Sequence, residues 1–358
     1  MKLQELCRFG QWRSSAVLAA IGLSGALAAA GQQDRSILVL TSTNSASGNA
    51  VIAFKLNTGQ TPSLSLQETL PTGGKGGASN NAGILQFQNG FGAVANYGSN
   101  TVTQFARYAD DILMTRTIGL ARDCVNPDSV ALTQDRIFVV GTKCAESHAW
   151  PWGYLDGPVV SLSDPSAAQI AVGKTWAAVT LTSGSLLQLP LASDGGFSGT
   201  SNVVTLPSDA NNTPLGAAFW GNILGFTPAH SPDSFAVVDE TLNVSPIAGP
   251  TPSYPTNAPC WVAKGPLSVW YTGNAPGDAI SIFFTDGQSG VFYKSVSLPG
   301  SPTDITVSPD QKWLAVIYTA GPQAYVAVFS IDELGDLTSV ATSVPVNVAS
   351  FSGVAISE

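Results

Sequence analysis

The 358-residue chain is poor in charged side chains, in histidine and in cysteine. Only 11% of its residues are Asp, Glu, Lys or Arg, and it holds 2 histidines and 4 cysteines. No Cys-x-x-Cys pair occurs, so the sequence has no zinc signature. It also lacks a G-x-S-x-G motif, and the glycine-rich stretch at 72–77 has neither the spacing nor the following helix of a phosphate-binding loop. We therefore expect no cofactor and no metal ion.

Acidic residues outnumber basic ones, 24 against 15, which gives a formal net charge of −9 at pH 7. An acidic surface repels phosphate backbones, so nucleic acid is an unsuitable partner. Low charge density together with a low isoelectric point suits an extracellular medium.

The N-terminal 30 residues have the pattern of a secretory signal peptide. Lys2, Arg8 and Arg13 precede an apolar run at 16–30 that ends in small residues. This run is short for a membrane span, and no later segment is long and apolar enough to cross a bilayer. We expect cleavage after residue 30, secretion and no membrane association afterwards, with an uncleaved anchor as the alternative.

Secretion would allow the cysteines to form a disulfide and two tripeptides to be glycosylated. Without Cys7 three cysteines remain, which in an oxidising compartment implies one disulfide and one leftover thiol. Asn211 and Asn243 begin tripeptides of the N-glycosylation pattern, although such tripeptides also arise by chance.

Composition and turns favour strands over helices. The chain holds 36 Gly and 23 Pro and is 44% hydrophobic, with many Val, Thr, Ser and Phe. The stretch 80–105 predicts two short strands joined by a tight turn at Asn89-Gly90, then a Gly/Ser/Asn loop and a third strand. We expect almost no α-helix.

Weaker copies of this unit recur along the chain. The most regular strand of each copy starts near residues 37, 91, 137, 176, 223, 267 and 313, an average spacing of about 46 residues. A period of this size with several strands per repeat is typical of propeller blades. The sequence predicts an all-β fold in which residues 31–358 form a single domain, a seven-bladed β-propeller.

The first and last units are complementary. The first starts at its second strand, near Ile37, whereas a spare strand at 351–356 follows the complete seventh unit. We expect this C-terminal strand to complete the first blade and to remove an exposed sheet edge. The third unit is irregular, because Glu146 to Gly157 has loop-like residues where a strand is due, so we expect a truncated blade with an aromatic-rich loop.

Two stretches carry a family resemblance. GAVANYGSNTVTQF at 92–105 and the segment 302–335 resemble the blade consensus of seven-bladed lactonase-type propellers, the group of bacterial phosphogluconolactonase and fungal muconate-lactonizing enzymes. The resemblance implies hydrolysis of a sugar lactone, without a metal, in a cleft on the face where the inner strands begin. The family has a His-x-His pair there, and the matching residues in this sequence are Asn126, Pro127 and Asp128.

The predicted topology gathers loops on that face, which we call the top face. It receives the loops that enter inner strands and the loops that link second to third strands. Cys124 and Cys144 lie there in the same blade, so we expect them to form the disulfide, with two buried free thiols as the alternative. Both histidines are expected on this face as well.

Lactone hydrolysis needs a base that activates water and a donor that stabilises the oxyanion. Candidates for the catalytic groups are His148, His230, Asp128 and Asp233. Candidates for ligand binding are Asn96, Asn126, Glu146, Trp150, Trp152, Trp261 and Asp304. The alternatives are that the histidines are surface residues, the carboxylates cap turns, the aromatic side chains fill the gap of the truncated blade, and Asn96 belongs to a structural turn.

Two functional hypotheses follow. The first is a secreted, monomeric propeller that hydrolyses or binds a small carbohydrate lactone in its top cleft. The second is a non-catalytic extracellular propeller that binds a glycan or a protein partner.

Overall fold

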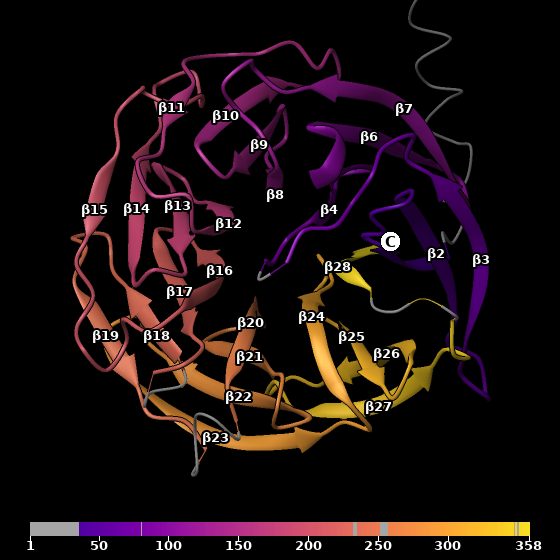
Figure 1. Cartoon of the computed structure of the whole chain (residues 1–358). Helices are drawn as coiled ribbons and strands as arrows, with labels where there is room; N and C mark the ends of the chain where they lie inside the picture. Colours follow the sequence, from indigo (N-terminus) through magenta and orange to yellow (C-terminus); the bar gives the residue numbers. More distant parts are fainter. Residues whose placement is uncertain (1–35, 80, 232–234, 251–256, 347, 349–350) are drawn as a thin grey trace, which may run out of the picture. The chain divides into compact units, whose positions relative to one another are not determined.

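Twenty-eight β-strands build the part of the chain that the computed structural model describes, namely residues 36–79, 81–231, 235–250, 257–346, 348 and 351–358. The strands form seven antiparallel sheets of four strands each, arranged as blades around a common axis (Figure 1). The helical element within these residues is a single 3-10 turn, η1 (Tyr97–Ser99). The predicted all-β, seven-bladed propeller is confirmed, whereas the expected signal peptide lies outside the described residues.

Each blade runs from an inner strand at the axis to an outer strand at the rim. Blade 1 comprises β28 (Ser352–Ser357), β1 (Ile37–Ser42), β2 (Ala50–Asn57) and β3 (Ser63–Pro71). Blade 2 comprises β4 (Leu85–Gln88), β5 (Phe91–Asn96), β6 (Thr101–Tyr108) and β7 (Asp111–Gly119). Blade 3 comprises β8 (Pro127–Leu132), β9 (Arg136–Gly141), β10 (Cys144–Ala149) and β11 (Val160–Ser161).

Blades 4 to 7 follow the same order along the chain. Blade 4 comprises β12 (Ala167–Val172), β13 (Trp176–Leu181), β14 (Ser185–Pro190) and β15 (Asn202–Val204). Blade 5 comprises β16 (Pro214–Trp220), β17 (Ile223–Pro228), β18 (Phe235–Val238) and β19 (Val244–Ile247). Blade 6 comprises β20 (Pro259–Lys264), β21 (Val269–Asn274), β22 (Ala279–Thr285) and β23 (Gly290–Ser297). Blade 7 comprises β24 (Ser301–Val307), β25 (Trp313–Ala320), β26 (Gln323–Ile331) and β27 (Leu337–Thr342).

The second strands are the most deeply buried. They begin within about two residues of the positions that the repeat predicts. Every residue of β5, β9, β13 and β21 is buried. Blades on either side cover both faces of each sheet, so these strands consist of continuous apolar or small residues without alternation.

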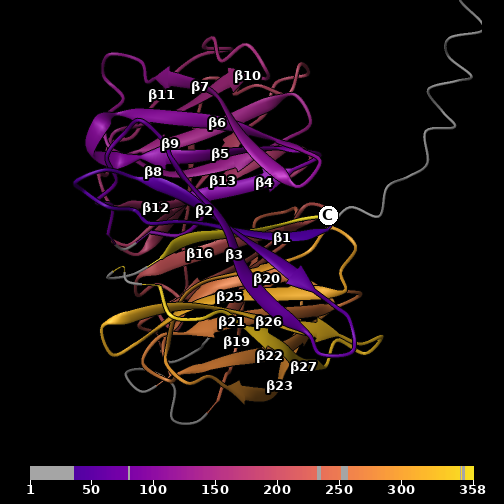
Figure 2. The same ribbon diagram turned by 90° about the vertical axis from the view of Figure 1, so that its right-hand side faces the viewer.

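The C-terminal strand closes the ring. β28 pairs antiparallel with β1, with Val39 opposite Ile356, as the spare strand predicts (Figure 2). Phe351 packs edge-on against Phe54 in the same blade. The pairing gives β1 a partner along an edge that would otherwise be open to solvent.

Arg107 joins this closure to blade 2. Its guanidinium is buried and donates to the backbone carbonyls of Ser357, at 2.8 Å, and of Ser36. Asp110 lies 3.4 Å from the same guanidinium and is exposed on its outer side. One side chain therefore contacts both strands that meet at the ring closure.

Blade 3 departs from the expectation in a specific way. Residues 146–149 do not form a loop: they are the second half of β10, and they are buried. The truncation lies in the outer strand β11, which has only two residues. The aromatic loop at 150–159 links the third strand to the fourth, so it lies on the bottom face, where first-to-second and third-to-fourth strand turns gather. The predicted top-face position of Trp150 and Trp152 is wrong, whereas Glu146 and His148 lie within the buried strand β10 and not in a loop.

Candidate functional site

A short segment crosses the axis at the top face. The chain that leads into β4 reaches to the middle of the ring, toward the inner strands of blades 5 and 6 (Figure 1). We call its described residues 81–84 the crossing segment. Most inner strands carry a bulge near their start, and the residue that follows the bulge faces this segment in blades 3, 6 and 7.

Gly83 makes the most contacts of the crossing segment. Its carbonyl accepts hydrogen bonds from the Val130 N–H, at 2.9 Å, and from the Ser129 hydroxyl, at 3.2 Å. Its own N–H donates to Asp304 Oδ2 at 3.4 Å. Gly83 has a φ of +67°, and a Cβ there would lie 3.0 Å from Gln169 Nε2. Glycine is therefore required both by the backbone conformation and by the lack of space.

Further blades hold the neighbours of Gly83. The indole N–H of Trp261 in blade 6 donates to the Asn81 carbonyl at 3.2 Å. The Ser352 hydroxyl of blade 1 donates to Asn81 Oδ1 at 3.4 Å, and the Ala82 N–H donates to the Ala168 carbonyl of blade 4 at 3.3 Å. Five blades thus bind the crossing segment, which covers the upper end of the axis.

A cavity of about 310 Å³ lies on the axis beneath the crossing segment. Gly83, Gln169 and Asp304 line its upper end, and Gln86, three residues further along the chain, lines it as well. A second hollow of about 370 Å³ shares part of this lining and extends to Asn89 and Pro309. These two residues belong to first-to-second strand turns, so the hollow reaches the bottom face.

Asp304 is the carboxyl group that lines this cavity. It is 6% exposed, and burial raises its pKa to about 7. Its Oδ1 accepts a hydrogen bond from the Ile305 N–H at 2.8 Å, and further backbone N–H groups of Gly83 and Gly353 favour the ionised form. The group is therefore close to half-ionised near neutral pH. It accepts hydrogen bonds from the crossing segment, through Gly83, and from β28, through Gly353.

Three carboxamides, a hydroxyl and one lysine complete the polar lining, namely Gln86, Gln88, Gln169, Thr306 and Lys264. Gln169 Oε1 accepts from the Ala217 N–H at 2.6 Å, while its Nε2 faces Gly83 beside Gln86 Nε2. The Nζ of Lys264 donates to the carbonyls of Gly265 and Leu267 and lies over the Trp220 ring. Lys264 thus lines the cavity while the backbone of its own turn accepts hydrogen bonds from its Nζ.

Asp128 occupies a separate position on the top face, between blades 2 and 3. It is 6% exposed, burial raises its pKa to about 7, and its Oδ1 is buried without a hydrogen-bond partner among the described residues. Burial and the nearby Asp128 raise the pKa of Tyr97. Asn126 donates its N–H to Asn100 Oδ1 and its amide to the Tyr97 carbonyl, so it joins two loops.

His148 and Glu146 form a buried pair inside the contact between blades 2 and 3. His148 Nε2 lies 2.7 Å from Glu146 Oε1, and Nδ1 lies 3.2 Å from the Gly153 carbonyl. Both partners are acceptors, so a neutral imidazole with one N–H satisfies only one of them. The Ala121 N–H also donates to the Glu146 carboxylate at 3.1 Å.

The predicted catalytic group does not assemble around one cleft. His230 is exposed on the top face of blade 5, where Nδ1 lies 3.1 Å from the Thr213 hydroxyl. His148 lies in blade 3, in the half of β10 nearer the bottom face. Asp233 lies outside the described residues. The two histidines therefore belong to different blades and different ends of the strands.

The remaining candidate ligand residues are also dispersed. Asn96 is fully buried, and its amide bonds to Thr72, Asn49 and Thr103 between blades 1 and 2, so it makes the structural turn contact that the alternative interpretation predicts. Trp150 stacks on Phe91 at a centroid distance of 4.1 Å. Trp152 is 64% exposed on the bottom face, whereas Trp261 contacts the crossing segment at the top. Trp150, Trp152 and Trp261 therefore do not form a common aromatic platform.

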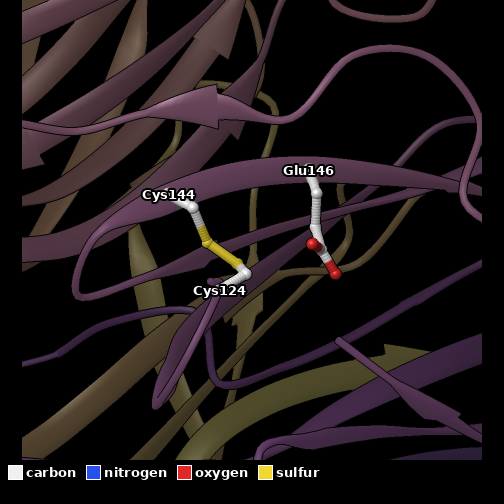
Figure 3. A group of neighbouring side chains, drawn as sticks. All are labelled: Cys124, Cys144 and Glu146. Carbon is white, nitrogen blue, oxygen red and sulfur yellow. A yellow bond between two sulfur atoms is a disulfide. The ribbon is translucent and has the colours of Figure 1, made fainter. Parts of the chain in front are cut away.

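The predicted disulfide is present. Cys124 and Cys144 are bonded, with Cα atoms 5.3 Å apart, and Glu146 lies beside them (Figure 3). The sulfurs and the carboxylate lie within 4.8 Å of one another, but sulfurs bonded to each other are not thiolate ligands for a metal. Cys260 is a free thiol on the top face, and burial raises its pKa to about 11.

Comparison with known proteins supports the fold. No protein-family model matches the chain, and no curated protein matches it. Similar solved structures include the periplasmic gluconolactonase of Pseudomonas aeruginosa, with a TM-score of 0.62, 15% identity, and coverage of 90% of this chain and 99% of that chain. A protein from Lactobacillus plantarum has a TM-score of 0.65, 14% identity, and coverage of 90% and 99%. Virginiamycin B lyase from Staphylococcus aureus has a TM-score of 0.56, 13% identity, and coverage of 74% and 85%.

The names of these neighbours include both a lactonase and a lyase. Identities this low establish a shared fold alone, because one propeller scaffold serves several chemistries. The chain is therefore similar to lactonase-type propellers in architecture.

Within the described residues, no helix has the length and apolarity of a membrane span.

Proposed function

We propose that the protein is a lactonase-type propeller that binds a small hydroxyl-rich ring, such as a sugar lactone, in the axial cavity. The supporting observation is the meeting of Gln86, Gln169 and Asp304 at the covered end of a cavity of about 310 Å³. Carboxamides donate to and accept from hydroxyl and carbonyl oxygens, and such a volume suits a single ring.

Binding without hydrolysis agrees best with the chemistry of the lining. Hydrolysis needs a free base beside a water molecule and a donor for the oxyanion. The oxygens of Asp304 already accept backbone hydrogen bonds. The other polar groups of the lining are amides, the Thr306 hydroxyl and Lys264, whose Nζ donates to the carbonyls of Gly265 and Leu267. The two histidines of the chain lie elsewhere. The non-catalytic hypothesis is thus favoured, with a small ligand in place of a macromolecular one.

Titration calorimetry with δ-gluconolactone and with gluconate tests this proposal. We expect saturable binding that Gln86→Ala and Gln169→Ala each weaken by about threefold to tenfold, the effect of one lost neutral hydrogen bond. Gln188→Ala is the matched control, because Gln188 lies in β14 and bonds to Asn202 on the outer strand. Absence of binding by the unaltered protein, or equal effects of all three variants, would contradict the proposal.

Lactone hydrolysis remains the second candidate, because a carboxyl group with a pKa of about 7 suits a general base near neutral pH. A pH-stat assay on δ-gluconolactone measures it directly. If Asp304 is the base, Asp304→Asn lowers the enzymatic rate by at least about 100-fold, whereas the double variant His148→Ala, His230→Ala keeps it. A rate equal to the spontaneous background in the unaltered protein excludes hydrolysis of this lactone.

We also propose that the protein is secreted and glycosylated. Asn211 and Asn243 are both exposed, as acceptor sites for glycans must be. Mass spectrometry of the protein recovered from culture medium tests both points through the N-terminal peptide and the two Asn-containing peptides. Binding to an extracellular protein or glycan is the alternative partner hypothesis, and the exposed Trp152 and Tyr154 on the bottom face are its best candidates.

A further inference from the structure

The two ends of the ring axis differ, and this difference bears on how a ligand reaches the cavity. We propose that small polar ligands enter the axial cavity from the bottom face, opposite to the face on which the family resemblance places the cleft. The inference rests on the proposed function only in taking this cavity as the ligand site.

The top end is covered by backbone that many blades hold. Gly83 is bonded to blades 3 and 7, Asn81 to blades 6 and 1, and Ala82 to blade 4. Opening this end requires the loss of several buried hydrogen bonds together. Each unsatisfied buried group costs about 1–3 kcal/mol, so a route that avoids this loss is favoured.

The contacts of Gly83 add a steric argument. A Cβ at this position would lie 3.0 Å from Ser129 Oγ, 3.0 Å from Gln169 Nε2 and 3.3 Å from Gln86 Nε2. These three side-chain groups therefore pack closely against Gly83, and the crossing segment forms the roof of the cavity.

The bottom end is bounded differently. Gln86, Phe87, Gln88, Thr306 and Val307 line both the axial cavity and the second hollow, so the two spaces adjoin along these residues. The second hollow extends to Asn89 in the turn between β4 and β5 and to Pro309 in the turn between β24 and β25. The second hollow thus adjoins the axial cavity and extends toward the turns of blades 2 and 7.

The side chains along this route set what can pass. Gln88 and Thr306 are polar and partly exposed, whereas Phe219 and Val307 offer apolar walls on the axial cavity. Among the residues that the structure describes, no acid or base lines the second hollow. The route is therefore suited to small uncharged molecules.

Thiol labelling tests the route without any sugar ligand. In a full-length background with Cys7→Ser and Cys260→Ser, Gln86→Cys places a reporter thiol between the two spaces. A small uncharged methanethiosulfonate reagent should modify it in the native protein. Val307→Trp, which narrows the bottom route, should slow the labelling by at least about tenfold, because the rate depends on access to the thiol.

The matched control changes a contact at the top end of the axis. Trp261→Phe removes the hydrogen bond to the Asn81 carbonyl and should leave the labelling rate within about twofold. Gln88→Trp is a second blocking variant, at the partly exposed end of β4, for the case that Val307→Trp unfolds the protein. Faster labelling in Trp261→Phe, no effect of either blocking variant, or no labelling before denaturation would overturn the inference.

This result is separable from the proposed function. Labelling from the bottom face together with no binding of gluconolactone or gluconate would defeat the ligand proposal and keep the route. Sugar binding together with labelling from the top face would do the reverse.

Discussion

Blades 3 and 7 both pack between two neighbouring blades, but their third and outer strands differ in composition and length. The third strand of blade 7 is QAYVAVFSI, which buries apolar side chains against its neighbours, and its outer strand β27 has six residues. The third strand of blade 3 is CAESHA, with three buried polar side chains, and its outer strand has two residues. Where a blade lacks most of the outer strand, specific polar interactions replace part of the lost sheet.

Blade 3 combines apolar packing with local polar interactions. Its apolar side chains belong to clusters that it shares with blades 2 and 4. The Cys124–Cys144 disulfide, the Glu146–His148 pair, the Arg136–Asp156 ion pair and the stacking of Trp150 on Phe91 add to this packing. Blade 7 has longer ladders and an apolar cluster that continues into blade 6. Substitutions at the polar and disulfide positions of blade 3 should therefore have larger effects than single substitutions in the ladders of blade 7.

The largest effect is expected for Glu146→Gln, which removes the buried carboxylate that lies 2.7 Å from His148 Nε2 and accepts from the Ala121 N–H. We expect a loss of about 3–5 kcal/mol in the free energy of unfolding, measured by denaturant titration. The double variant Glu146→Gln, His148→Gln replaces both partners and should recover part of this loss. Equal losses in the single and double variants would show that the pair carries no charge interaction.

Loss of the disulfide in blade 3 gives the next largest effect. Replacing Cys124 and Cys144, which are 20 residues apart, by serine should cost about 3 kcal/mol, mostly through the less restricted unfolded chain. Cys260→Ser is the control and should change stability by less than about 0.5 kcal/mol, because this thiol lies partly exposed and unbridged. A Cys124→Ser, Cys144→Ser variant as stable as the parent would contradict this role of the disulfide.

The two buried carboxyl groups, Asp128 in blade 3 and Asp304 in blade 7, predict the pH dependence of stability. Burial raises each pKa from 3.8 to about 7, so the folded state binds protons more tightly than the unfolded state. Their favourable protonated form is fully present below pH 3.8, and stability falls as the pH rises from there to about 7. The melting temperature should be higher at pH 5 than at pH 8.

Substituting asparagine at each position separates the contributions of Asp128 and Asp304 to the pH dependence of stability. Asp128 Oδ1 has no hydrogen-bond partner among the described residues, so Asp128→Asn should stabilise the protein at pH 8 by on the order of 1–3 kcal/mol and flatten the pH profile. Asp304→Asn keeps only one side-chain acceptor for the Gly83 and Ile305 N–H groups, so it should flatten the profile with a smaller gain or none. Identical gains from both variants would contradict this distinction.

The smallest effect compares two stacked aromatic pairs. Trp150 lies over Phe91 in the contact of blade 3 with blade 2, and Tyr318 lies over Tyr325 within blade 7 at 5.1 Å. Trp150→Leu and Tyr325→Leu should each lose about 1 kcal/mol beyond the area term. We also expect faster proteolysis of the 150–159 loop in Trp150→Leu, because the stacked Trp150 holds this loop against blade 2. Proteolysis at the same rate as in the parent would remove this difference between blades 3 and 7.

The repeat could be predicted because each blade repeats the same local pattern. Second strands such as Trp176–Leu181 are continuous apolar runs, and the turn at Asn89-Gly90 is a strong hairpin signal. The spare strand and the cysteines that one blade brings together also follow from counting strands. Fold and disulfide therefore depend on regularities that the sequence displays directly.

The site depends on exceptions to the pattern. The polar residues Glu146 and His148 predict a loop because such residues are rare in buried strands, and only their mutual hydrogen bond makes the strand possible. Gly83 contacts Ser129 and Asp304, far away in sequence, and no local signal shows such a crossing. Gln86 and Gln169 resemble ordinary strand residues until the ring brings their amides together. Asp304 is the one sequence-predicted candidate among the described residues that lines the cavity.

The pairing of β28 with β1 also has a consequence for synthesis on the ribosome. The first blade to be synthesised has three strands and an unpaired edge, and its inner strand is made only after all the other described strands. Until that strand pairs, the nascent chain exposes the β1 edge, to which another polypeptide can add.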